Sequence, residues 1–387
     1  GQAAQLAVPP PFRNFVGQAR LGVSQQDHEA FFRGLLGDVD EPTAPFGLLD
    51  VRGEGRGIAE ARLELDAGLA QRLRERARKL GVSAASLCHL AWAQVLARVS
   101  GREEVVFGTV LFGRMQGGAG ADRVMGLFIN TLPVRIRVGE EGVEASVQGT
   151  HTLLADLLRH EHASLALAQR CSGVPAPAPL FSALLNYRHS QGMVHAPSAE
   201  ARQAWEGVEV LYSEERTNYP LMLSVDDRGE GFGLTAQVQD PIDPRRVCDF
   251  MNTALEGLVE ALERAPTRAV RSLDVLPEAE RRQVVVEWNA TEAEYPKERC
   301  IHQLIEAQVE RTPEAVAVVF EDHGLSYRTL NRRANQLAHH LQGLGVGPEV
   351  LVGVCMERSV EMVVGLLGIL KAGGAYVPLD PAYPEER

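Results

Sequence analysis

The sequence predicts an α/β protein built in two parts. Over residues 1–272, runs of β-branched and aromatic residues alternate with amphipathic helical patterns. Over residues 297–387, short apolar strands again alternate with helices, which indicates the beginning of a second α/β sheet. Residues 273–296 are charged and lack a core pattern, as an interdomain connector does. We therefore expect two domains joined by a linker.

The composition is that of an ordinary globular protein. A chain of 387 residues that is 45% hydrophobic and 23% charged can bury a sizeable core. The net charge of −12 and the scattered arginines argue against a nucleic-acid partner, which requires a concentrated basic patch. No apolar stretch is long enough to span a bilayer, and the first residues lack the pattern of a signal peptide. We expect a cytoplasmic protein with no membrane partner.

The cysteines and histidines do not suggest a metal or disulfide site. Five cysteines, an odd number without close spacing, indicate reduced thiols. His160 and His162 form an H-x-H pattern within the segment HEHASL, but no cluster of carboxylates or cysteines supports a metal there. We expect no bound metal.

Before the central stretch, the sequence predicts three helices and a strand. The helices cover residues 27–36, 67–80 and 83–99, and alternation predicts a strand over 61–65. The third helix is apolar nearly all round, so it should be buried. His89 lies inside it, and we interpret this residue as a hydrogen-bonded core histidine.

The central stretch, residues 105–138, consists of two apolar strands around a glycine-rich loop. The first strand covers residues 105–111 and the second covers 129–138. A high density of glycine indicates positive φ angles or close backbone approach. Arg114 and Asn130 are the polar residues that stand out against this apolar background.

After the central stretch, the pattern continues with helices and short strands. The predicted helices are 143–161, 245–264, 301–311, one that begins after Ser326, and 362–370; the predicted strands are 208–212, 221–225, 232–238, 315–320 and 350–356.

Two parts of the first domain resemble condensation domains of nonribosomal peptide synthetases. The family pattern has a glycine, any residue, Phe, Val or Ile, and then Asn-Thr, a few residues after a Gly-Arg loop. Here Gly126, Phe128, Ile129, Asn130 and Thr131 stand at those positions. A second family element is a Pro-Leu-Phe strand that ends in Asn, matched by Pro179, Leu180, Phe181 and Asn186.

The second domain resembles the start of an adenylation domain, a member of the AMP-forming acyl-activating enzymes. Residues 370–381, LKAGGAYVPLDP, match the family's second core motif almost residue for residue, and LSYRTLNRRANQLAHHL is similar to the first. The order of condensation followed by adenylation is that of a synthetase module.

The first resemblance implies a chloramphenicol-acetyltransferase-like lobe, a mixed sheet with helices, over residues 1–272. It also implies peptide-bond formation between thioesters held on the phosphopantetheine arms of carrier proteins. The family's catalytic motif, HHxxxDG, does not occur here. The pair His339–His340 lies in the adenylation-like helix, and we interpret it as part of a solvated helix face.

The candidate site residues are those that would line the substrate tunnel: Arg114, Asn130 and Thr131. Arg114 could hold a loop or a phosphopantetheine arm, and Asn130 could hydrogen-bond across the lobes or orient a substrate amide. A structural loop contact is the alternative for both residues. A complete adenylation domain would use ATP and Mg²⁺, but the loop that holds ATP phosphates is absent. We therefore expect an internal fragment, inactive and cofactor-free alone, whose partners are carrier proteins and the remaining lobes.

Three alternatives remain open at this point. An epimerisation or dual epimerisation/condensation domain is a close relative. A coenzyme-A-dependent acyltransferase would share the fold, although it would not lead into an adenylation domain. A non-catalytic fragment that serves only in carrier docking is the third.

Overall fold

The computed structural model describes residues 11–53, 57–113, 124–189, 207–208 and 217–384. The candidate Arg114 and most of the strand predicted over 208–212 lie outside these residues. The chain divides into two compact units, Gly1–Asn289 and Ala290–Arg387, and each is described here by itself.

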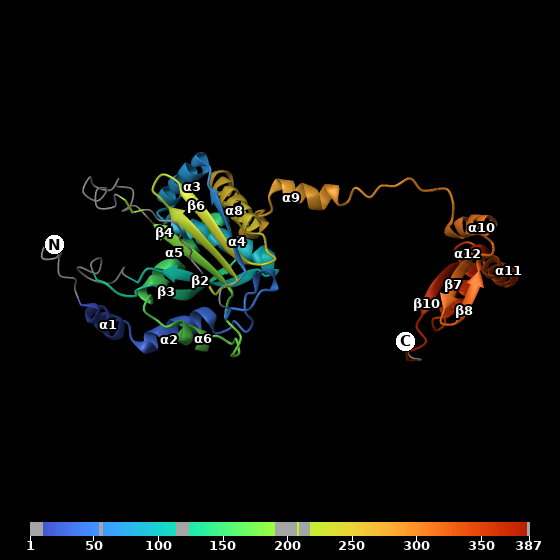
Figure 1. The fold of residues 1–387 in the computed structure, drawn as a ribbon, viewed down its shortest axis with the longest axis horizontal. Coiled ribbons are helices and arrows are strands. Elements are labelled where there is room, and N and C mark those ends of the chain that lie inside the picture. The colour runs from blue at the N-terminus through green and yellow to red at the C-terminus, as the bar shows by residue number, and fades with distance from the viewer. Residues whose placement is uncertain (1–10, 54–56, 114–123, 190–206, 209–216, 385–387) are drawn as a thin grey trace. The chain divides into compact units, whose positions relative to one another are not determined.

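The first unit contains one mixed sheet with helices around it (Figure 1). Its elements are α1 (Phe12–Leu21), α2 (Gln25–Leu36), β1 (Ile58–Glu64), α3 (Ala67–Leu80), α4 (Ala84–Ser100), β2 (Glu104–Leu111), β3 (Asn130–Arg137), α5 (Val143–Arg159), α6 (Leu165–Arg170), β4 (Ala183–His189), β5 (Leu221–Asp227), β6 (Phe232–Gln239), α8 (Pro244–Arg264) and α9 (Glu278–Arg282). The fold class predicted for this part is confirmed.

The six strands that the structure describes run in the order β1-β6-β5-β4-β2-β3. Strand β4 pairs in parallel with both β2 and β5, and the remaining pairs are antiparallel. The parallel pairs place strand ends from distant parts of the chain side by side. Helices α3, α4 and α8 lie along one side of the sheet, and α6 contacts β3 (Figure 1).

Helix α4 is the centre of the core. Every residue from Ser86 to Ala97 is buried, as the all-round apolar pattern predicts. His89 within it uses both ring nitrogens: Nδ1 lies 2.7 Å from the Ala85 carbonyl oxygen, and Nε2 lies 2.8 Å from Thr109 Oγ1. The interpretation of His89 as a hydrogen-bonded core histidine is confirmed. Burial lowers the pKa of His89 to about 4.

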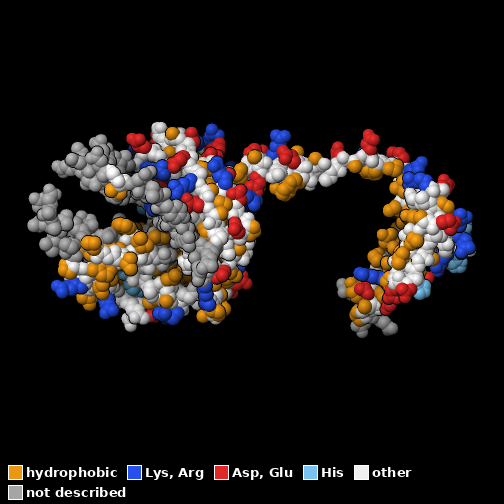
Figure 2. Space-filling model, viewed as in Figure 1, with side chains coloured by type: hydrophobic (Ala, Val, Ile, Leu, Met, Phe, Trp, Pro, Cys, Tyr) orange, Lys and Arg blue, Asp and Glu red, His pale blue; other side chains and the backbone are white. Residues whose placement is uncertain are grey.

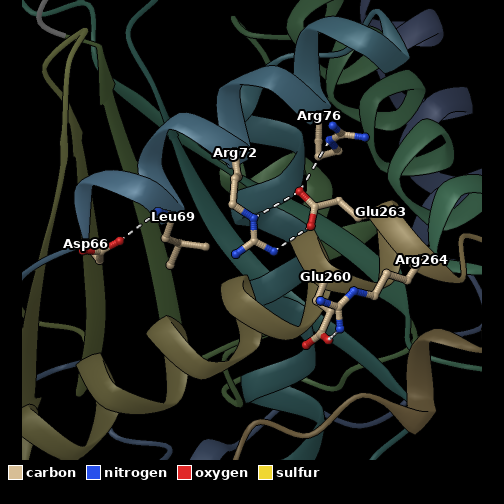
Figure 3. Close-up of polar contacts among 7 residues, drawn as sticks. All are labelled: Asp66, Leu69, Arg72, Arg76, Glu260, Glu263 and Arg264. Carbon is tan, nitrogen blue, oxygen red and sulfur yellow. Dashed lines mark hydrogen bonds and ion pairs between the residues drawn. The ribbon is translucent and has the colours of Figure 1, made fainter.

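Helices α3 and α8 are joined at the surface by charged side chains (Figure 3). Arg72 of α3 donates two hydrogen bonds to Glu263 of α8, at 3.1 and 2.7 Å, and Arg76 approaches the same carboxylate at 3.8 Å. The start of α3 is capped by Asp66, whose carboxylate accepts hydrogen bonds from the backbone N–H groups of Gly68 and Leu69. The contacts of Arg72 and Arg76 hold the C-terminal end of α8 against α3, while the cap stabilises the start of α3.

The sequence patterns missed some elements of this unit. Helix α1 was not predicted, because it has no buried residue and its Phe12 and Phe15 meet a partner distant in sequence, Phe128. Helix α6 was also missed, since it spans only 6 residues. The region predicted as an irregular connector contains the short helix α9, and a helical turn over Gln283–Glu287 follows it; neither has a buried residue.

The second unit is a small α/β assembly. Its elements are α10 (Ile301–Arg311), β7 (Val316–Phe320), β8 (His323–Ser326), α11 (Tyr327–Gly343), β9 (Leu351–Cys355), α12 (Val360–Ala372) and β10 (Ala375–Leu379). Strands β9 and β10 pair in parallel, while β7 and β8 form an antiparallel hairpin. Leu330, Ala334, Val364 and Leu367 pack between α11 and α12 to form its core.

All five cysteines are free in the structure, as predicted. Among the described helices, none is by itself long and apolar enough to cross a membrane; α3 and α4 would qualify only as a pair bent by 111°.

Candidate functional site

The candidate site lies where β2 ends and β3 begins. In this antiparallel pair, Leu111 is opposite Asn130 and Val110 is opposite Thr131. Gly113 has a φ of 71°, and a Cβ there would overlap the carbonyl group of Phe128. The glycine therefore permits the close approach of the two backbones that the glycine-rich pattern predicted.

The glycine of the Gly-x-Phe-Ile-Asn-Thr motif has a packing role. A Cβ on Gly126 would overlap the ring of Phe12, which belongs to α1. Phe128 of the same motif meets Phe12 and Phe15, with ring centroids 5.4 and 4.3 Å apart. Gly126 and Phe128 thus form part of the surface against which α1 packs.

Asn130 joins β3 to the segment HEHASL, whose role the sequence left open. Its Nδ2 group donates to the carbonyl oxygens of Glu161 at 2.8 Å and Ala163 at 2.7 Å. Its Oδ1 atom accepts a hydrogen bond from the backbone N–H of Thr131 at 3.0 Å. Both amide hydrogens and the amide oxygen therefore have partners within the protein.

The side chains of HEHASL pack against the N-terminal helices. His160 Nδ1 lies 2.8 Å from His28 Nδ1, and the His160 ring stacks on Phe31 with centroids 4.2 Å apart. His162 meets the edge of Phe15 at 5.1 Å. Burial lowers the pKa values of both His28 and His160. These pairings join residues more than 100 positions apart, so no local pattern could have revealed them.

The described residues contain no group of three or more His, Cys, Asp or Glu side chains arranged to hold a metal ion. Of the HEHASL side chains, Glu161 is fully buried, and its Oε1 lies 3.7 Å from His162 Nε2. His160 and His162 are half-buried, and Ser164 is exposed.

An apolar surface surrounds the ends of β2 and β3. Phe112, Met125, Leu127 and Ile129 are between 62% and 91% exposed. Figure 2 shows apolar side chains gathered on this part of the first unit. Such a cluster is typical of a surface that another protein segment or an apolar ligand covers.

The histidine pair and the LKAGGAYVPLDP motif of the second unit occupy an exposed helix face and structural positions, respectively. His339 and His340 are both exposed on α11, which confirms that they belong to a solvated helix face. Lys371 of the LKAGGAYVPLDP motif is almost fully buried and pairs with Glu306 of α10. Gly373, with a φ of 92°, ends α12 and lets the chain turn into β10.

Comparison with known proteins identifies both parts of the chain. Residues 5–285 match the condensation-domain family, and residues 305–387 match the AMP-binding enzyme family. Malpinin synthetase of Mortierella alpina is 54% identical over the whole chain, and bacitracin synthase 3 of Bacillus licheniformis is 32% identical, again over 100% of the chain. The chain spans only 5% and 6% of the length of these two relatives.

Solved structures show the same fold. A four-domain nonribosomal peptide synthetase bound to AMP and glycine superposes with a TM-score of 0.68 over 96% of this chain and 29% of its own, at 16% identity. The synthetase FmoA3 gives a TM-score of 0.63 over 98% of this chain and 40% of its own, at 25% identity. The chain therefore belongs to the nonribosomal peptide synthetases, as a condensation domain followed by the start of an AMP-binding domain.

Proposed function

We propose that, within a complete synthetase, the first unit belongs to the domain that forms peptide bonds between aminoacyl or peptidyl thioesters, and that the second unit begins a domain that activates an amino acid. The observation that carries this proposal is the order of the two family matches within one continuous stretch, which aligns over its whole length with relatives named as synthetases and synthases. We assign residues 1–272 to condensation, 273–296 to the linker and 297–387 to adenylation.

The partners and cofactors follow from this assignment. Carrier-protein domains present the two acyl groups on phosphopantetheine, and a complete adenylation domain uses ATP and Mg²⁺. The remaining lobes of both domains, in the same cytoplasmic polypeptide, are further partners. Neither HHxxxDG nor the loop that would hold ATP phosphates occurs in this sequence, so the chain by itself is expected neither to form peptide bonds nor to exchange pyrophosphate.

Arg114, Asn130 and Thr131 belong to the wall of the condensation tunnel in this proposal. Asn130 and Thr131 are the first residues of β3, beside the exposed apolar surface, and the hydrogen bonds of Asn130 hold the neighbouring loop. Arg114 supplies a cation that suits the phosphate or carbonyl oxygens of a phosphopantetheine arm.

Arg114→Ala in the intact parent module tests this role. Loss of one charge-assisted hydrogen bond, about 1.5–3 kcal/mol, slows condensation by roughly ten- to a hundredfold. Amino-acid-dependent pyrophosphate exchange is unchanged, because adenylation takes place in another domain. Equal loss of both activities indicates misfolding, and unchanged dipeptidyl transfer contradicts the role of Arg114. Arg13→Ala, at an exposed position of α1, is the control.

A further inference from the structure

A second polar cluster lies at the ends of β4 and β5, on elements other than those that carry Asn130. These strands run in parallel, and their last residues, His189 and Asp227, are paired across the sheet. His189 Nδ1 lies 3.0 Å from Asp227 Oδ2. In α/β sheets, the carboxyl ends of parallel strands are where ligands most often bind.

Asp227 is a buried carboxylate with four hydrogen-bond donors. Its Oδ1 accepts from Arg74 Nη2 at 2.6 Å and from the backbone N–H of Gly229 at 3.1 Å, while its Oδ2 accepts from Tyr187 at 2.6 Å and from His189. Burial alone would raise the pKa of Asp227, but these donors outweigh it and hold the pKa well below its ordinary range. Asp227 is therefore ionised and accepts hydrogen bonds only.

The ionised carboxylate fixes the tautomer of His189. Because Asp227 has no proton to give, the hydrogen between the two residues is on Nδ1. In the neutral ring, Nε2 then carries a lone pair, and no other described residue bonds it. The His189 side chain is 49% exposed. A buried carboxylate that orients the ring leaves Nε2 placed to accept a hydrogen bond from a ligand.

His189 also lines a cavity of about 630 Å³. The end of α3 and the turn into α4 also line this cavity: Ala77, Val82 and Ala84 present apolar groups, and Arg78 is exposed. This volume lies within the range of sites for small molecules, which typically combine apolar walls with a few polar groups.

We propose that His189, oriented by Asp227, is the hydrogen-bond acceptor of a ligand site in this cavity. The ligand is a small neutral molecule with an apolar body and a hydroxyl group. Its O–H donates a hydrogen bond to His189 Nε2, while Asp227 accepts the hydrogen on Nδ1. Arg74 and Tyr187 already satisfy the carboxylate and join β4, β5 and α3, so a purely structural cluster would not require His189.

The test compares histidine reactivity within one protein. The purified protein is treated with diethyl pyrocarbonate at about pH 8, where free imidazole is neutral, and labelling is followed by mass spectrometry of its peptides. His189 is expected to react about tenfold faster than the exposed His339 and His340, because Asp227 stabilises the charge that develops on the ring. Equal rates at the three histidines overturn the proposal.

Two variants and two probes complete the design. Asp227→Asn lowers labelling at His189 to the rate of His339, whereas Tyr187→Phe, which keeps the carboxylate, leaves it within about twofold. Circular dichroism verifies that both variants are folded. If Asp227→Asn is unfolded, the labelling rates of His189, His339 and His340 in the wild-type protein and the protection by benzyl alcohol decide. Benzyl alcohol slows labelling at His189 alone. Absence of protection, or protection by benzoate but not by benzyl alcohol, contradicts the proposed ligand class.

Discussion

Replacement of Asn130 tests whether its side-chain amide holds the HEHASL segment against β3. Asn130→Ala removes three hydrogen bonds: two that Nδ2 donates to the carbonyl groups of Glu161 and Ala163, and one that Oδ1 accepts from the backbone N–H of Thr131. At about 0.5–1.5 kcal/mol for each, the loss in the free energy of unfolding is about 1.5–4.5 kcal/mol. Asn130→Asp has nearly the same shape but places an acceptor oxygen where Nδ2 now donates. It should therefore cost at least as much as the alanine variant.

Urea denaturation of the first unit measures these losses, with the fluorescence of the fully buried Trp92 among the reporters of unfolding. Thr131→Val is the matched control: it is next in the strand, nearly isosteric and only half-buried, so its effect should stay within about 0.5 kcal/mol. If Asn130→Ala is no more destabilising than Thr131→Val, or if Asn130→Asp is the milder of the two Asn130 variants, the amide is not the support that its contacts indicate.

Three further predictions concern the core, the α3–α8 contact and the cysteines. Burial lowers the pKa of His89 from 6.5 to about 4, so as the pH falls His89 is protonated in the unfolded chain before it is protonated in the folded protein. The free energy of unfolding should therefore fall by about 2 kcal/mol from pH 7 to pH 5, and His89→Gln should lose this part of the pH dependence; an unchanged dependence contradicts it. Arg72→Ala should cost about 0.5–1 kcal/mol, and Arg264→Ala, which removes only an exposed pair within α8, should cost less; the reverse order in urea denaturation counts against the contact. All five thiols should react with a thiol reagent after denaturation without reductant, and fewer would reveal a disulfide.

Local patterns predicted the regular elements well. The strands expected over 105–111 and 232–238 are β2 and β6, and the helix expected over 245–264 is α8. In each of these segments the pattern of apolar residues is that of a single kind of element, strand or helix, and such a pattern is enough to recognise the element. The strand order could not be predicted in this way, because β4 lies between β2 and β5 through contacts between distant segments.

The candidate site shows the same limit. The motif around Asn130 was recognisable in sequence, but its link to HEHASL was not, since the contacts join residues 31 and 33 positions apart. His189 and Asp227 were missed for the same reason. They are 38 residues apart, His189 lies just after the matched Asn186 but at no position of the motif, and only the pairing of β4 with β5 brings it to Asp227.

Peptide-bond formation by the intact synthetase is the most direct test of the proposed function. The synthetase, with its carrier domains loaded, is supplied with the amino acid, ATP and Mg²⁺, and the acyl groups on each carrier are identified by mass spectrometry. We predict a peptidyl thioester on the acceptor carrier. We also predict that Asn130→Ala slows its formation while amino-acid-dependent pyrophosphate exchange stays at the wild-type rate. Inversion of the donor residue without a new amide bond, or acyl transfer to coenzyme A, would contradict the assignment of the first unit to condensation.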